Sequence, residues 1–164
     1  MGELVQTVKD QPIGTAAILV VGKAVNFREH LRWFDTRPLF GLRALVMHSK
    51  EQPDDLGELL EGFGAEVVID TDATLDRIYR QLLDGEFDIV TFTSASAVLE
   101  FAASAGVDQA SDLLAHTVVA TLGPAAADAA GRAGMAPAIQ LPAGTLATLA
   151  EAVAVHFKHA TATA

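Results

Sequence analysis

Short apolar runs alternate with amphipathic stretches along most of the chain. The runs have the length and β-branched content of buried strands, and they lie at 44–47, 66–69, 88–92, 117–121 and 139–141. Between them, apolar residues recur at helical spacing, which predicts helices at 56–63, 75–83, 96–105, 124–133 and 145–157. Gly64 and Gly85 follow two of these helices as stop signals.

Strands that alternate with helices predict a parallel sheet covered on both faces. Right-handed crossovers then favour the flavodoxin-like strand order 2-1-3-4-5. The predicted fold class is therefore α/β: a flavodoxin-like, five-stranded parallel sheet with helices on both faces. A short strand at 16–21 and a helix near Phe27, Leu31 and Phe34 form an N-terminal appendage. The expected organisation is an appendage with a linker at 1–41, a lobe at 42–158 and a disordered tail at 159–164.

Composition narrows the classes of function. The formal net charge of −10 argues against a basic nucleic-acid-binding face. The chain has no cysteine, which excludes disulfides, thiolate nucleophiles and cysteine-based zinc sites. No apolar run is long enough to span a bilayer, and the first residues lack a signal-peptide pattern. We therefore expect a cytoplasmic protein with no nucleic-acid or membrane partner.

Small and hydroxyl-bearing residues follow the last three predicted strands. Thr93, Ser94 and Ser96 come directly after the strand at 88–92. Gly123 and Pro124 follow the next strand, and Gly144 and Thr145 follow the last strand at the start of the last helix. Open α/β sheets bind ligands at the carboxyl ends of their strands, and helix N-termini attract anions there. The simpler interpretation is that Ser94, Ser96 and Thr145 only cap helices, at about 1 kcal/mol each.

Other sites are weaker on the sequence alone. Neither the Gly-x-x-x-x-Gly-Lys-Ser/Thr phosphate loop nor the Gly-x-Gly-x-x-Gly fingerprint is present. A response-regulator receiver would need an aspartate where Thr93 and Ser94 stand. His156 and His159 are three residues apart and could bind a metal, but a solvated helix end explains them better, so we expect no metal site.

The Thr-Phe-Thr-Ser-x-Ser-x-Val stretch from Thr91 and the Gly-Pro-Ala stretch from Gly123 resemble the uroporphyrinogen-III synthase family. Residues 42–158 carry this resemblance, with about half of a normal synthase missing between Asp70 and Ala73. Residues 16–41, which end in Arg-Pro-Leu-Phe-Gly, resemble the C-terminal end of uroporphyrinogen-III C-methyltransferase without its catalytic body. The resemblance implies one of the two similar lobes of the synthase fold.

The resemblance also implies a function in tetrapyrrole (heme, siroheme or cobalamin) biosynthesis. Family members close hydroxymethylbilane to uroporphyrinogen III with loss of water, as lyases without a metal or an organic cofactor. The implied ligand is thus a linear or cyclic tetrapyrrole, with Thr93, Ser94, Ser96, Gly123, Pro124, Gly144 and Thr145 as its binding residues. His48 and Lys50 take the place of a family arginine, and Ala126 stands where a threonine is usual. No catalytic residue can be assigned.

The family's cleft lies between two lobes, and this leaves three hypotheses. A homodimer could rebuild the cleft and give an active synthase. Alternatively, the chain is a non-catalytic tetrapyrrole-binding or dimerisation module. A third hypothesis is a remnant with no function of its own. Turnover of hydroxymethylbilane and binding of uroporphyrinogen separate the three.

Overall fold

The computed structural model describes Lys23, Phe27 and residues 35–47, 55–69, 75–106 and 109–161. The chain divides into two compact units, Met1–Trp33 and Phe34–Ala164. The predicted strand at 16–21 and most of the helix near Phe27 lie outside the described residues. The rest of this section concerns the second unit, which we call the lobe.

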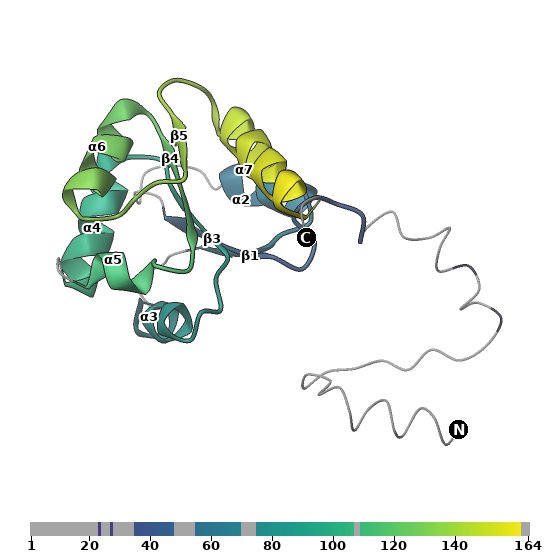
Figure 1. Ribbon diagram of the computed structural model, residues 1–164, viewed down its shortest axis with the longest axis horizontal. Coiled ribbons are helices and arrows are strands. Elements are labelled where there is room, and N and C mark those ends of the chain that lie inside the picture. Colours follow the sequence, from purple (N-terminus) through teal and green to yellow (C-terminus); the bar gives the residue numbers. More distant parts are fainter. Residues whose placement is uncertain are drawn as a thin grey trace, which may run out of the picture. The chain divides into compact units, whose positions relative to one another are not determined.

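Five parallel strands form the sheet of the lobe, in the order β2-β1-β3-β4-β5 (Figure 1). The strands are β1 (Arg43–Met47), β2 (Glu66–Ile69), β3 (Ile89–Phe92), β4 (Val118–Leu122) and β5 (Ile139–Leu141). This order confirms the predicted flavodoxin-like arrangement. Two strands have the predicted bounds, and the other three differ by one residue at one or both ends.

Helices cover both faces of the sheet. They are α2 (Asp55–Gly62), α3 (Leu75–Leu83), α4 (Ala95–Ala105), α5 (Ala110–Leu113), α6 (Pro124–Arg132) and α7 (Leu146–Thr161). In Figure 1, α2 and α7 lie together on one side of the sheet, and α4 and α6 lie on the other. None of the helices in the described part of the chain is both long and apolar enough to cross a membrane.

Two apolar layers sandwich the sheet, because side chains of successive strand residues point to opposite faces. The layer beneath α2 and α7 contains buried side chains from four strands and both helices, among them Ala44, Val46, Leu60, Ile89, Ala120, Ile139, Leu149 and Val153. On the other face, Phe92 and Phe101 pack edge to face with ring centroids 5.6 Å apart. The continuous burial of β3 is typical of a central parallel strand.

Residues 35–42, which precede β1, pack against the rest of the lobe. Leu39 is fully buried, and its N–H donates to the Phe63 carbonyl oxygen at 3.0 Å. Gly64 permits this approach, since its φ is +102° and a Cβ placed there would lie 2.8 Å from the Arg37 Cβ. The predicted linker is therefore attached to the lobe through at least one core residue.

Two helices differ from the sequence predictions by more than one residue at an end. The four-residue helix α5 was not predicted, because so short an element shows no apolar period. Helix α7 continues to Thr161, so the tail that was expected to be disordered from residue 159 is helical for its first three residues. No glycine or proline interrupts the alanine-rich sequence there, and alanine favours the helix. Residues 162–164 lie outside the described part.

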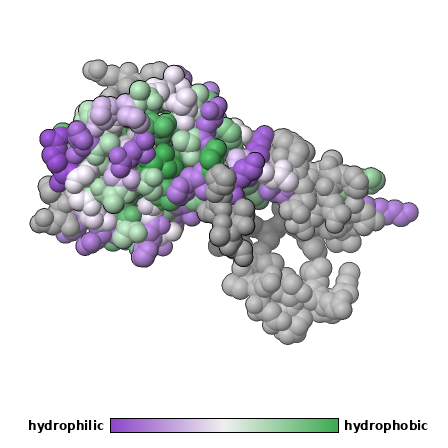
Figure 2. All heavy atoms as spheres, turned by 45° about the horizontal axis from the view of Figure 1, so that its top comes forward, coloured by the Kyte–Doolittle hydropathy of each residue, from purple (hydrophilic) through white to green (hydrophobic). Residues whose placement is uncertain are grey.

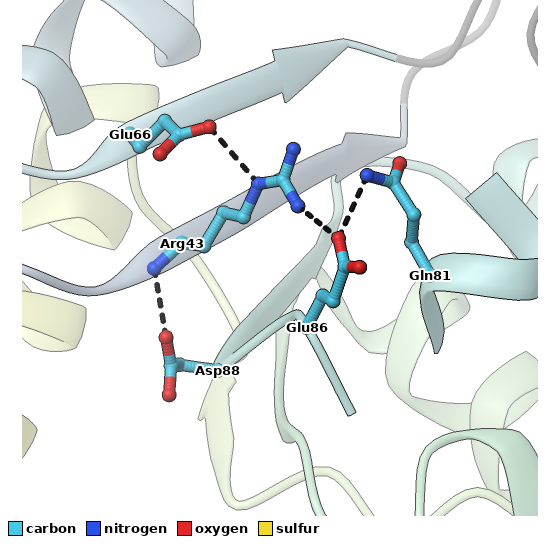
Figure 3. A network of polar contacts seen from close by, with 5 residues as sticks. All are labelled: Arg43, Glu66, Gln81, Glu86 and Asp88. Atoms are coloured by element: carbon cyan, nitrogen blue, oxygen red, sulfur yellow. Dashed lines mark hydrogen bonds and ion pairs between the residues drawn. The ribbon is translucent and has the colours of Figure 1, made fainter. Parts of the chain in front are cut away.

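Arg43 joins three segments at the amino-terminal edge of the sheet (Figure 3). Its Nε lies 3.1 Å from Glu66 Oε1, an ion pair without the alignment of a hydrogen bond, and its Nη1 donates to Glu86 Oε2 at 2.5 Å. Its backbone N–H donates to Asp88 Oδ2 at 2.8 Å, and its guanidinium carbon lies 5.1 Å from the ring centroid of Phe87. These contacts tie β1 to the edge strand β2 and to the turn before β3.

Candidate functional site

The carboxyl ends of β3, β4 and β5 lie in a row. Phe92 pairs with Thr121, and Leu122 pairs with Leu141, so the three strands end at nearly the same level. Neighbouring strands are about 4.8 Å apart, which places the junctions after β3 and β5 about 10 Å from each other. We call this row, with the first turns of α4, α6 and α7, the carboxyl edge.

Ser94 begins helix α4. It has extended backbone angles (φ −150°, ψ 158°), and its Oγ accepts a hydrogen bond from the Ala97 N–H at 3.2 Å. The Ser94 and Ser96 hydroxyl oxygens are 2.9 Å apart, and Ser96 is exposed. Ser94 is therefore a helix cap, as the simpler interpretation expected. Thr93, half-buried just before it, lies at the same edge.

Gly123 begins helix α6 in a conformation that only glycine adopts readily. Its φ is 87° and its ψ is 152°. Its N–H donates to the Leu141 carbonyl oxygen at 2.7 Å, which ties the start of α6 to the end of β5. Pro124 occupies the first turn, where its fixed φ suits a helix and its missing N–H costs nothing. No side chain caps this helix, so its N-terminus faces the edge without a hydroxyl.

Thr145 and Thr148 cap helix α7 reciprocally. The Thr148 N–H donates to Thr145 Oγ1 at 3.3 Å, and the Thr145 N–H donates to Thr148 Oγ1 at 2.8 Å. This is the arrangement of a capping box with threonine in place of glutamate. Gly144 leaves room for it, because a Cβ at this position would collide with Thr148 Oγ1. The Thr145 hydroxyl thus has a structural role as well.

The carboxyl edge offers neutral donors and no cation in these three segments. Residues 93–97, 123–128 and 142–148 contain no lysine or arginine. The first N–H groups of each helix lack an acceptor within the helix, and the positive end of its dipole favours anions by about 0.3–1 kcal/mol at an exposed site. Figure 2 shows a narrow band of apolar side chains among polar ones on one face. The edge can therefore bind carboxylates through main-chain amides.

The structure brings seven of the nine predicted binding residues to this edge: Thr93, Ser94, Ser96, Gly123, Pro124, Gly144 and Thr145. His48 and Lys50 lie outside the described residues; β1 ends just before them at Met47, beside Phe92. Among the residues that the structure describes, no group of three His, Asp or Glu side chains could bind a metal ion.

A hollow of about 240 Å³ opens between the first turn of α6 and the end of β5. Its lining is partly apolar and partly polar: Pro124, Ala127, Asp128, Gln140, Leu141 and Pro142. Sequence reasoning found Pro124 alone among these, because the hollow forms only when two segments meet across the β4–β5 pairing. Asp128 lies one helical turn after Pro124, so its spacing from the predicted binding residue Pro124 was the signal that could have placed it near the edge.

Known proteins resemble this chain over much of its length. The family model described as uroporphyrinogen-III synthase HemD matches residues 36–151. A Bacillus subtilis (strain 168) protein named uroporphyrinogen-III C-methyltransferase is 34% identical over 102 residues, which cover 58% of this chain and 20% of that protein. A Ruminiclostridium josui protein named porphyrin biosynthesis protein HemD is 40% identical over 68 residues, which cover 42% of this chain and 14% of that protein.

A solved structure shares the fold of the lobe. The uroporphyrinogen III synthase of Thermus thermophilus superposes with a TM-score of 0.50 at 20% sequence identity, over 74% of this chain and 52% of that one. The chain thus spans about half of the solved synthase and a smaller share of the curated relatives. With the family model matching well over half of its residues, the chain belongs to the uroporphyrinogen-III synthase family.

Proposed function

We propose that this chain binds a tetrapyrrole with several carboxylates at the carboxyl edge and acts in tetrapyrrole biosynthesis in the cytoplasm. The observation that carries the proposal is the family match over residues 36–151, which includes the ends of β3 and β4 and the start of α7. Family membership supplies the ligand class, and the edge supplies three helix N-termini in a row. Main-chain N–H groups can donate hydrogen bonds to the carboxylates of such a polyanion in spite of the net charge of −10.

The proposed reaction is the closure of hydroxymethylbilane to uroporphyrinogen III with loss of water. Holding the two reacting ends together can lower the barrier by about 7–11 kcal/mol without any catalytic side chain. Ser94 Oγ accepts from the Ala97 N–H, so its own hydrogen can be donated to Ser96 Oγ. The Ser96 hydroxyl hydrogen is then available for donation to a bound ligand and can assist the departure of the hydroxyl group.

Turnover in this proposal requires a second lobe that faces the carboxyl edge. The chain covers 52% of the solved synthase, so a single copy supplies one side of the expected cleft. A homodimer with its two carboxyl edges facing each other would supply both sides. The rate per chain should then increase with protein concentration, because more of the chain is dimeric.

A second candidate function is a non-catalytic tetrapyrrole-binding module. The absence of lysine and arginine from residues 93–97, 123–128 and 142–148 favours it. Ala126 favours it too, since a buried methyl group stands where the family usually has a hydroxyl. Binding would then survive without turnover.

One experiment separates the two functions. The chain is incubated with hydroxymethylbilane at increasing protein concentration, and the uroporphyrinogen isomers are separated by chromatography. Type III product above the spontaneous type I background supports the synthase. Type I product alone, with a melting temperature raised by uroporphyrinogen III, supports the binding module. Absence of both effects contradicts the proposal.

A pair of variants tests the edge itself. The double variant Ser94→Ala/Ser96→Ala should weaken ligand binding by more than its loss of stability explains. Ser104→Ala, an exposed serine at the other end of the same helix, is the matched control and should leave binding unchanged.

A further inference from the structure

The hollow between α6 and β5 has the size of a subsite rather than of a whole ligand site. Its volume is about 240 Å³, whereas pockets for complete small molecules usually measure about 300–1,000 Å³. It opens at the carboxyl edge, since Pro124 is the first residue of α6 and Leu141 is the last residue of β5. A single ring of a larger ligand would fill it while the rest of the ligand extends over the edge.

The walls of the hollow suit a flat ring. Pro124 and Pro142 contribute rigid pyrrolidine rings, and Leu141 and Ala127 contribute further apolar surface. The Gly123 N–H donates a hydrogen bond to the Leu141 carbonyl oxygen at 2.7 Å, and this fixes the separation of the start of α6 from the end of β5, which form the walls. The shape of the hollow is thus set by backbone contacts rather than by flexible side chains.

The polar part of the hollow can accept a hydrogen bond from a ligand. Asp128 is exposed and makes no hydrogen bond or ion pair with any residue that the structure describes, so its carboxylate, which can only accept when ionised, is open to a ligand. The neighbouring Gln140 turns its Nε2 away to the Pro137 carbonyl oxygen at 3.2 Å. A ring N–H would therefore meet an unpaired acceptor, while a carboxylate in the same place would be repelled.

We propose that this hollow binds one pyrrole ring of the ligand, with the ring N–H donating to the Asp128 carboxylate. The inference rests on the proposed function for the ligand class and adds the orientation of one ring. The acidic substituents of that ring point out of the hollow, because Asp128 repels them and the N-termini of α6 and α7 attract them. Asp128 thus acts as an orienting residue in a protein whose other edge contacts are neutral.

The test uses a monopyrrole with a free N–H and two carboxylate side chains, and its N-methyl derivative as the matched ligand. Binding of both to the wild type and to Asp128→Asn is measured by calorimetry. Because Asp128 is exposed and exchanges water for the ligand, the hydrogen bond is worth about 0.5–1.5 kcal/mol, so N-methylation should weaken wild-type binding about two- to tenfold. In Asp128→Asn the same methylation should have a much smaller effect. Asp112→Asn, an exposed aspartate on α5, should behave like the wild type.

Equal effects of N-methylation in the wild type and Asp128→Asn would overturn the inference, and so would the absence of monopyrrole binding at millimolar concentration. Either result leaves the proposed function standing if uroporphyrinogen III still raises the melting temperature. If uroporphyrinogen III does not raise the melting temperature of the wild type, the proposed function itself is contradicted.

Discussion

Alanine in place of Gly123 is expected to destabilise the lobe, although the added methyl group meets nothing. A Cβ at this position has no atom within 4 Å, so the whole cost comes from the backbone angles. At φ 87° and ψ 152° the residue lies in a region that is almost exclusive to glycine, where another residue costs about 1–3 kcal/mol. For a domain of this size, 1 kcal/mol corresponds to about 4 °C, so the melting temperature should fall by about 4–12 °C.

Gly131 in the same helix provides the matched control. It too has no atom within 4 Å of an added Cβ, but it is exposed and has a helical backbone. Gly131→Ala should therefore stabilise the lobe by roughly 0.5–1 kcal/mol. Urea unfolding of both variants measures directly whether the free energy of unfolding falls in Gly123→Ala and rises in Gly131→Ala. Equal stability of Gly123→Ala and the wild type would refute the geometry assigned to the start of α6, and with it the alignment of that helix with the ligand.

Three further predictions concern the caps and the amino-terminal edge. Ser94→Ala should lose about 1 kcal/mol of unfolding free energy, because it removes the hydrogen bond from the Ala97 N–H that caps α4. Ser96→Ala should change the stability by less than about 0.5 kcal/mol. Urea titrations that rank the two variants in the reverse order would contradict the cap. Thr145→Ala should also lose about 1 kcal/mol in the same assay, and an unchanged midpoint would exclude the reciprocal cap of α7. Arg43→Met should cost about 1–2 kcal/mol at low salt, because it removes two ion pairs of roughly 0.2–1 kcal/mol each and the contact with the Phe87 ring. The loss should be smaller at high salt, which screens the ion pairs. Exposed Arg77→Met is its control, and equal losses in the two variants would show that the Arg43 contacts contribute nothing.

The fold could be predicted because its signals are local. Each strand of the lobe is a short, largely apolar run, and each long helix shows an apolar stripe and a glycine or a cap at one end. Helix α5 escaped detection because Ala110–Leu113 is shorter than two turns. The end of α7 was placed too early because the apolar stripe stops near Phe157, whereas the alanine-rich sequence continues the helix to Thr161.

The candidate site could be predicted only in part. Residues that directly follow a strand, such as Ser94 and Gly123, can be assigned to the carboxyl edge from topology alone. The hollow could not, because Asp128 and Pro142 come together only through the pairing of β4 with β5. The Arg43 contacts with Glu66 and Glu86 are long-range for the same reason, as they join residues 23 and 43 positions apart in the sequence.

The most direct test of the central claim is a titration of the isotope-labelled chain with uroporphyrin III, followed by amide NMR. The account predicts that the largest shifts fall on the first turns of α4, α6 and α7, at residues 95–97, 125–127 and 146–148. Amides near Arg43 and Glu66, at the opposite end of the strands, should stay unchanged. Shifts centred on that opposite end, or no shifts at all, would contradict tetrapyrrole binding at the carboxyl edge.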